Sequence, residues 1–238
     1  MKIKYVALTG ADHTVKQQAL ADLSQKYPYA EWAILFSQSK AGVARYPSHD
    51  WAVDLAGLAR DASMNLAAHL CGKWVEDALN GKITFVNNTS FNAAFGRLQL
   101  NMGTERLKAA VTCEPLFDAV KHVRQDVIFG GNYRHITIDA EFFLKSGLFP
   151  LFDASGGRGV ETKDWPEPFR LSNGTPLVCG YAGGLGPDNV ADELVRIEDK
   201  AKEAVVWIDM ETKLRSKSDN FDLEKCEAVL QAAQRWVG

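Results

Sequence analysis

The most constraining feature of this sequence is the repeated alternation of short apolar runs with longer amphipathic ones. Eight apolar runs have the length and composition of strands, and segments that can be helical follow them. Such alternation favours parallel strands joined by crossover helices, and eight units in 238 residues fit a closed barrel better than an open sheet. We therefore predict one domain over residues 1–238, a (β/α)8 TIM barrel. The predicted strands are Lys4–Leu8, Trp32–Phe36, Asn65–Leu70, Arg97–Leu100, Asp126–Phe129, Leu148–Phe152, Leu177–Tyr181 and Ala204–Ile208.

Several helix signals agree with this assignment. A helix is predicted over Thr14–Lys26, and Ser48 is a typical N-cap for another over Asp50–Arg60. The run Asp188–Val190 opens a further helix. Residues 82–94 are the least regular stretch, and we interpret them as the irregular end of the third helix. The last helix has the clearest apolar spacing, after Asp222, with Leu223, Cys226, Val229, Leu230 and Ala233.

Charge and composition limit the partners. Lys and Arg total 27 against 30 Asp and Glu, a net charge of −3, so no overall positive field attracts nucleic acid or anionic lipid. The apolar run in Met1–Leu8 is too short for a signal peptide, and Phe142–Phe152 is broken by polar residues and too short to span a membrane. We expect a cytoplasmic monomer or homodimer with a small-molecule ligand. The scattered cysteines Cys71, Cys113, Cys179 and Cys226 have no zinc-site spacing, so we expect free thiols and neither metal nor cofactor.

In a TIM barrel, functional groups lie at the carboxyl ends of the strands and in the loops that follow. Gly183 and Gly184 follow the seventh strand, and their small size lets a phosphate approach the backbone next to a helix start. A tight turn that needs positive φ explains the same glycines. The residues at the carboxyl ends of the predicted strands, or in the loops after them, are Thr9, Ser37, Gln38, His69, Gln99, Asn101, Asp153, Gly183, Gly184, Asp209 and Glu211.

Three side chains in this region suit catalysis by their chemistry. Asp153 follows an apolar strand and precedes a glycine-rich stretch at 156–159, where partial burial would raise the pKa of its carboxyl group toward neutrality. A turn or cap aspartate is the alternative. His69 suits either acid or base catalysis by its ordinary pKa, or it is a hydrogen-bonded barrel histidine. Lys213, just past the eighth strand, could form a Schiff base, although a solvated lysine explains it equally.

Several short segments, spread over most of the chain, form a recognisable series. The segments are Ala44–Ser48, Leu98–Asn101, Leu151–Asp153, Gly156–Gly159, Asp164–Trp165, and Ala182–Leu185 with Pro187 and Asn189–Val190. In order and approximate spacing they resemble motifs of the phosphoribosylanthranilate isomerase family. The first is similar to that family's Ser-Pro-Arg-Tyr motif after the second strand, and the second is similar to its Val-Gln-Leu-His fourth strand.

The resemblance implies a cofactor-independent barrel enzyme that performs an Amadori rearrangement of a phosphoribosylamine with an aspartate acid and a cysteine base. It assigns the acid to Asp153 and phosphate binding to Gly183 and Gly184. It places the arginine that binds the substrate carboxylate at Arg45 and the strand-eight aspartate at Asp209. Together with Arg45, the expected substrate-binding residues are then Thr9, Gln99, Asn101 and Asp209.

The chain departs from this family at three places. Thr9 stands where the family has its cysteine, and a threonine hydroxyl cannot act as a base near neutral pH. Glu211 and Lys213 replace part of a phosphate-binding Ser-Ser-Gly, and Asn101 replaces a histidine. We therefore expect an isomerase or lyase that acts on a small sugar-phosphate-like substrate and is inefficient with phosphoribosylanthranilate. Its base would be His69 or Glu211. The alternatives are a barrel that binds a ligand without turnover, and a lyase or aldolase that uses Lys213.

Overall fold

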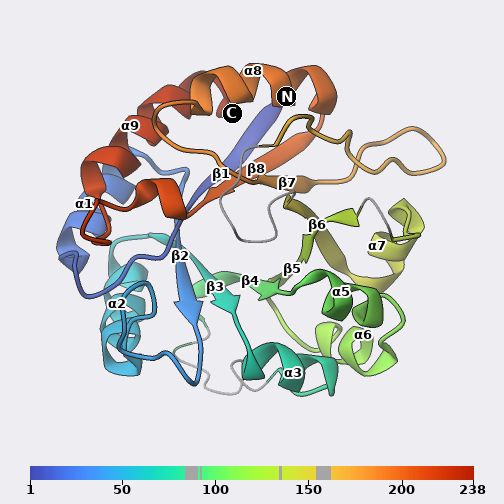
Figure 1. The fold of residues 1–238 in the computed structure, drawn as a ribbon, viewed down its shortest axis with the longest axis horizontal. Helices are drawn as coiled ribbons and strands as arrows, with labels where there is room; N and C mark the ends of the chain where they lie inside the picture. The colour runs from blue at the N-terminus through green and yellow to red at the C-terminus, as the bar shows by residue number, and fades with distance from the viewer. Residues whose placement is uncertain (84–90, 92, 134–135, 154–161) are drawn as a thin grey trace.

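Eight parallel strands form a closed barrel in chain order, with β8 pairing back onto β1 (Figure 1). This confirms the predicted (β/α)8 barrel. The computed structural model describes residues 1–83, 91, 93–133, 136–153 and 162–238. The glycine-rich stretch 156–159 and most of the stretch 82–94 lie outside these residues. The strands are β1 (Lys2–Thr9), β2 (Ala30–Phe36), β3 (Asn65–Leu70), β4 (Phe95–Asn101), β5 (Asp126–Gly131), β6 (Leu148–Asp153), β7 (Cys179–Ala182) and β8 (Val205–Met210).

Helices surround the barrel and bury their apolar faces against it (Figure 1). The Ser48 hydroxyl accepts a hydrogen bond from the Trp51 amide, so this predicted N-cap is confirmed. The Asp222 carboxylate caps α9 in the same way, by accepting a hydrogen bond from the Lys225 amide. In the part of the chain that the structure describes, no helix is long and apolar enough to cross a membrane. The helices are α1 (Gln17–Lys26), α2 (His49–Asp61), α3 (Lys73–Leu79), α5 (Thr104–Ala110), α6 (Glu114–Val120), α7 (Ala140–Ser146), α8 (Val190–Ala201) and α9 (Leu223–Ala233), with 3-10 turns η3 (Thr212–Leu214) and η4 (Gln234–Trp236).

The sixth unit differs from the prediction. Residues 162–178 contain no helix and instead run as an extended segment with an antiparallel bridge between Arg170 and Pro176 (Figure 1). Three prolines in these residues remove backbone donors and disfavour helical geometry in the residues before them. The segment is fixed by side chains: Trp165 donates to Glu193 at 2.7 Å, and Tyr181 donates to the Pro166 carbonyl at 2.9 Å.

A buried ion pair fills the barrel interior. Arg97 Nε donates to Glu31 Oε2 at 2.7 Å, and both side chains are almost completely buried. The guanidinium group lies 5.0 Å from the Tyr5 ring centroid and 4.5 Å from that of Trp207. Side chains two residues apart on a strand point to the same face. Residues two positions further along β4 and β8 therefore form the next interior layer, nearer the carboxyl ends of the strands.

Candidate active site

A cavity of about 460 Å³ opens at the carboxyl ends of the strands. It is lined by residues from all eight strands and from loops that follow them. Ser37 and Gln38 are not among the lining residues. The predicted site residues that line it are Thr9, Arg45, His69, Gln99, Asn101, Asp153, Gly183, Gly184, Asp209 and Glu211, together with Lys213.

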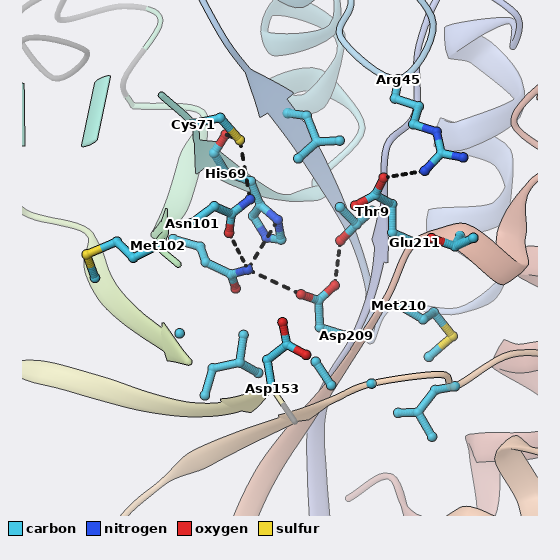
Figure 2. A pocket seen from close by; sticks show the side chains of 18 of the residues that line it. Thr9, Arg45, His69, Cys71, Asn101, Met102, Asp153, Asp209, Met210 and Glu211 are labelled. Atoms are coloured by element: carbon cyan, nitrogen blue, oxygen red, sulfur yellow. Dashed lines mark hydrogen bonds and ion pairs between the residues drawn. The ribbon is translucent and has the colours of Figure 1, made fainter. Parts of the chain in front are cut away.

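Asp153 and Asp209 lie at the same level of the barrel. In the strand register Asp153 pairs with Ala182 and Ala182 pairs with Asp209, so one small residue separates the two carboxyl-bearing positions. Figure 2 shows both carboxyl groups in the same part of the cavity, facing one another. The negative charge of Asp153 contributes to a raised pKa at Asp209, as expected for neighbouring carboxylates.

Asp209 is held by two hydrogen bonds. Thr9 Oγ1 donates to Asp209 Oδ1 at 2.5 Å, and Gln99 Nε2 donates to Asp209 Oδ2 at 3.3 Å (Figure 2). The side chain is 7% exposed, and burial raises the pKa of its carboxyl group to about 6 even though both hydrogen bonds lower it. A carboxyl group of this pKa is mostly ionised at neutral pH and still accepts a proton readily. Thr9 therefore positions a candidate base.

His69 is an unfavourable base in this environment. The side chain is 1% exposed, and burial lowers the pKa of the imidazole to about 3. The ring is therefore neutral at physiological pH. Gln99 Nε2 lies 3.4 Å from His69 Nδ1 and 3.0 Å from Asn101 Oδ1, to which it donates.

Glu211 and Arg45 form an ion pair across the mouth of the cavity. Arg45 Nη1 contacts Glu211 Oε1 at 2.9 Å, and Arg45 Nη2 contacts Asp219 Oδ1 at 2.8 Å. Burial raises the pKa of Glu211, and the Arg45 contact opposes that rise. Because two carboxylates already neutralise Arg45, an incoming ligand carboxylate would have to compete with them.

A buried arginine, Arg215, links the loops around this ion pair. Arg215 Nη2 contacts Asp12 Oδ2 at 2.8 Å, Arg215 Nη1 donates to the Gly10 carbonyl at 2.7 Å, and Asp12 Oδ2 also accepts the Arg45 amide at 2.6 Å. These contacts join the loops after β1, β2 and β8. Sequence reasoning missed Arg215 and Asp12, because nothing in a single sequence shows that residues 203 positions apart are paired.

The glycine pair after β7 forms a turn that lines the cavity. Gly183 has φ 124° and Gly184 has φ 67°, so this tight turn needs glycine for its positive φ angles. Both residues also line the cavity. The Asn189 side chain donates to the Gly184 carbonyl and accepts the Gly186 amide. The Asn189 and Val190 amides donate to the Gly186 carbonyl, and the first residues of α8 are not among those that line the cavity.

Lys213 is the cation next to this turn. A Cβ atom on Gly186 would lie 2.5 Å from Lys213 Cβ, so the lysine stem packs directly on the Gly186 backbone. Lys213 lines the cavity together with Gly183 and Gly184. A phosphate at this turn would therefore meet Lys213 and not the helix start.

The cavity also contains a thiol that sequence reasoning placed only among the free cysteines. Cys71 follows β3, and Asn101 Nδ2 donates to Cys71 Sγ at 3.4 Å (Figure 2). Burial raises the pKa of this thiol. Its position directly after a strand could have identified it as a cavity residue. Among the residues that the structure places, no three His, Cys, Asp or Glu side chains come together as a metal site.

Comparison with known proteins identifies the fold. The sequence matches no protein-family model, and no curated protein sequence matches it. The structure is similar to that of TrpF from Jonesia denitrificans, with a TM-score of 0.62 and 16% identity over 98% of this chain and 97% of that one. It is also similar to phosphoribosyl anthranilate isomerase from Thermus thermophilus, with a TM-score of 0.58 and 14% identity over 99% of both chains. The YdjI aldolase from Escherichia coli K12 has a TM-score of 0.50 and 10% identity over 98% of this chain and 88% of that one. The chain therefore has a TrpF-like TIM-barrel fold.

Proposed function

We propose that this barrel is an acid–base enzyme of the isomerase or lyase type that acts on a small sugar-phosphate-like substrate. The main evidence for this proposal is the pair of carboxyl groups of Asp153 and Asp209, which face one another at one level of the cavity. Two titratable groups in different environments at one site are a common basis for acid–base catalysis. The names of the TrpF and isomerase structures support the same reaction class.

Asp209 is the base in this proposal. It takes a proton from the carbon next to the substrate carbonyl, and the electron pair of the broken C–H bond forms the carbon–carbon double bond of an enol. Asp153, which the family resemblance assigns as the acid, protonates the substrate oxygen in the same step, so the reactive form of the pair carries its one proton on Asp153 while Asp209 is ionised. Asp209 is preferred to His69 because burial makes the imidazole a very weak base, and to Glu211 because Arg45 binds that carboxylate.

Phosphate binding at the turn after β7 is the first test of the ligand class. We expect inorganic phosphate to shift the backbone amide resonances of Gly183 and Gly184 in a titration followed by NMR. Lys213→Met keeps the stem that packs on Gly186 but removes the charge, so it should weaken phosphate binding by about tenfold, as expected for the loss of one charged hydrogen bond. Lys217→Met, on the exposed part of the same loop, is the matched control. Shifts confined to another region would exclude this phosphate site.

Phosphoribosylanthranilate itself should be a poor substrate. Thr9 cannot replace the cysteine base that the family resemblance implies for this substrate, and a substrate carboxylate must compete with Glu211 and Asp219 for Arg45. We expect at most slow turnover in a direct assay with freshly generated substrate. A Thr9→Cys variant assayed beside the unaltered protein reports whether the cavity otherwise accepts this compound. Efficient conversion by the unaltered protein would contradict the assignment of Thr9 and Arg45.

A further inference from the structure

Two side chains that line the cavity each have a buried polar atom without a hydrogen-bond partner among the described residues. These atoms are His69 Nε2 and Gln99 Oε1, on the neighbouring strands β3 and β4. The two side chains are 1% and 5% exposed. A buried polar atom without a partner destabilises the protein, because it has lost its hydrogen bonds to water. Such atoms at a cavity wall are explained if a ligand supplies the missing partners.

The hydrogen-bond pattern identifies which atom donates and which accepts. Gln99 must direct its amide nitrogen toward the Asp209 carboxylate, because an ionised carboxylate only accepts. Its oxygen, Oε1, is therefore the unpartnered acceptor. His69 Nδ1 lies 3.4 Å from the same amide nitrogen, which only donates, so a proton on Nδ1 would face another N–H group; the proton of the neutral ring is therefore placed on Nε2. His69 Nε2–H is thus an unpartnered donor.

This pairing of one donor with one acceptor selects a chemical group. A hydroxyl accepts from one partner and donates to another, and two adjacent hydroxyls can satisfy both atoms. A phosphate or carboxylate would satisfy His69 but leave Gln99 unpartnered, and an ammonium group would do the reverse. In the closed strand order, β3 and β4 lie across the barrel from β7 and the glycine turn after it.

We propose that His69 Nε2 and Gln99 Oε1 recognise one hydroxyl, or two adjacent hydroxyls, of a polyhydroxylated ligand whose phosphate lies at Gly183 and Gly184. The proposal rests on the proposed function, because it names the end of the sugar-phosphate-like substrate that lies opposite the phosphate. His69 thereby becomes a specificity residue and not an acid or base.

Two probes of equal chain length test this assignment. Ribitol 5-phosphate carries hydroxyls and no carbonyl, so it cannot react as an aldose or ketose, and pentyl phosphate has the same chain without hydroxyls. By titration calorimetry we expect the unaltered protein to bind ribitol 5-phosphate at least tenfold more tightly than pentyl phosphate. His69→Phe should lose about tenfold in affinity for ribitol 5-phosphate and leave pentyl phosphate and inorganic phosphate unchanged. His122→Phe, an exposed histidine outside the cavity, is the control.

The outcomes separate this inference from the proposed function. If phosphate and both probes bind equally, or His69→Phe binds ribitol 5-phosphate normally, hydroxyl recognition at His69 is wrong and the phosphate site stands. If none of the three binds, both proposals are wrong. A measurement on the unaltered protein does not depend on the variant folding: 15N NMR of the His69 ring should show the Nε2–H tautomer. The Nδ1–H tautomer would overturn the inference.

Discussion

Replacing Asp209 with asparagine should reduce the turnover of the sugar phosphate that the protein converts by about 10²–10⁴-fold, the usual cost of losing a general base. The amide keeps the shape of the side chain but cannot accept the substrate proton. Asp199→Asn, on the exposed face of α8, is the matched control and should leave turnover unchanged.

The pH dependence of the same reaction identifies the base. The base must be ionised, so kcat/KM of the unaltered protein should fall as the pH decreases through about 6, the pKa of Asp209. Residual activity of the Asp209→Asn variant should lack this fall. If the variant keeps both the rate and the pH dependence, the base lies elsewhere, and Glu211 becomes the next candidate.

Stability provides an independent control for Asp209→Asn. A buried carboxyl whose folded pKa is about 6 favours the protonated form, so the contribution of Asp209 to the stability of the fold decreases as the pH rises from about 4 to about 6. Above that range the penalty is constant and on the order of 3 kcal/mol. Because asparagine carries no charge, we expect the variant at pH 8 to unfold at a urea concentration no lower than the unaltered protein does. Lost activity would then not reflect unfolding.

Replacing Asp153 with asparagine should also reduce turnover by about 10²–10⁴-fold while leaving ligand affinity within about tenfold. Asparagine keeps the side-chain shape but offers no labile proton. The negative charge of Asp153 raises the pKa of Asp209, so its removal should lower that pKa and move the acid-side fall in residual activity to lower pH. If Asp153 only shapes a turn, its replacement should change neither the turnover nor the pH at which activity falls. Full activity with an unchanged pH profile would therefore show that Asp153 is a turn residue and not the acid.

The barrel could be predicted from the sequence because each strand–helix unit has its own local pattern. The sixth unit was the exception: its prolines and its Asn173–Gly174 turn signal an extended segment, but the strict alternation of the other units outweighed them. The positions of the site residues followed from the barrel itself, since the ends of parallel strands meet at one opening.

The pairing of those residues could not be predicted in the same way. Thr9 and Asp209 are 200 positions apart, and Arg45 and Glu211 are 166 apart, so only the closed barrel shows that they touch. The burial that makes His69 a weak base likewise depends on side chains from several strands. A single sequence gives the location of a strand end but not the pKa of the group there.

Exchange of carbon-bound hydrogen with solvent is the most direct test of acid–base catalysis by this pair of carboxyl groups. The protein is incubated in deuterium oxide with five- and six-carbon phosphorylated aldoses and ketoses, and 1H NMR and mass spectrometry follow deuterium at the carbon next to the carbonyl. We predict deuterium incorporation by the unaltered protein and its loss in both Asp209→Asn and Asp153→Asn. Tight binding of these compounds with no incorporation between pH 6 and 8 would contradict an enzyme and identify a ligand-binding barrel.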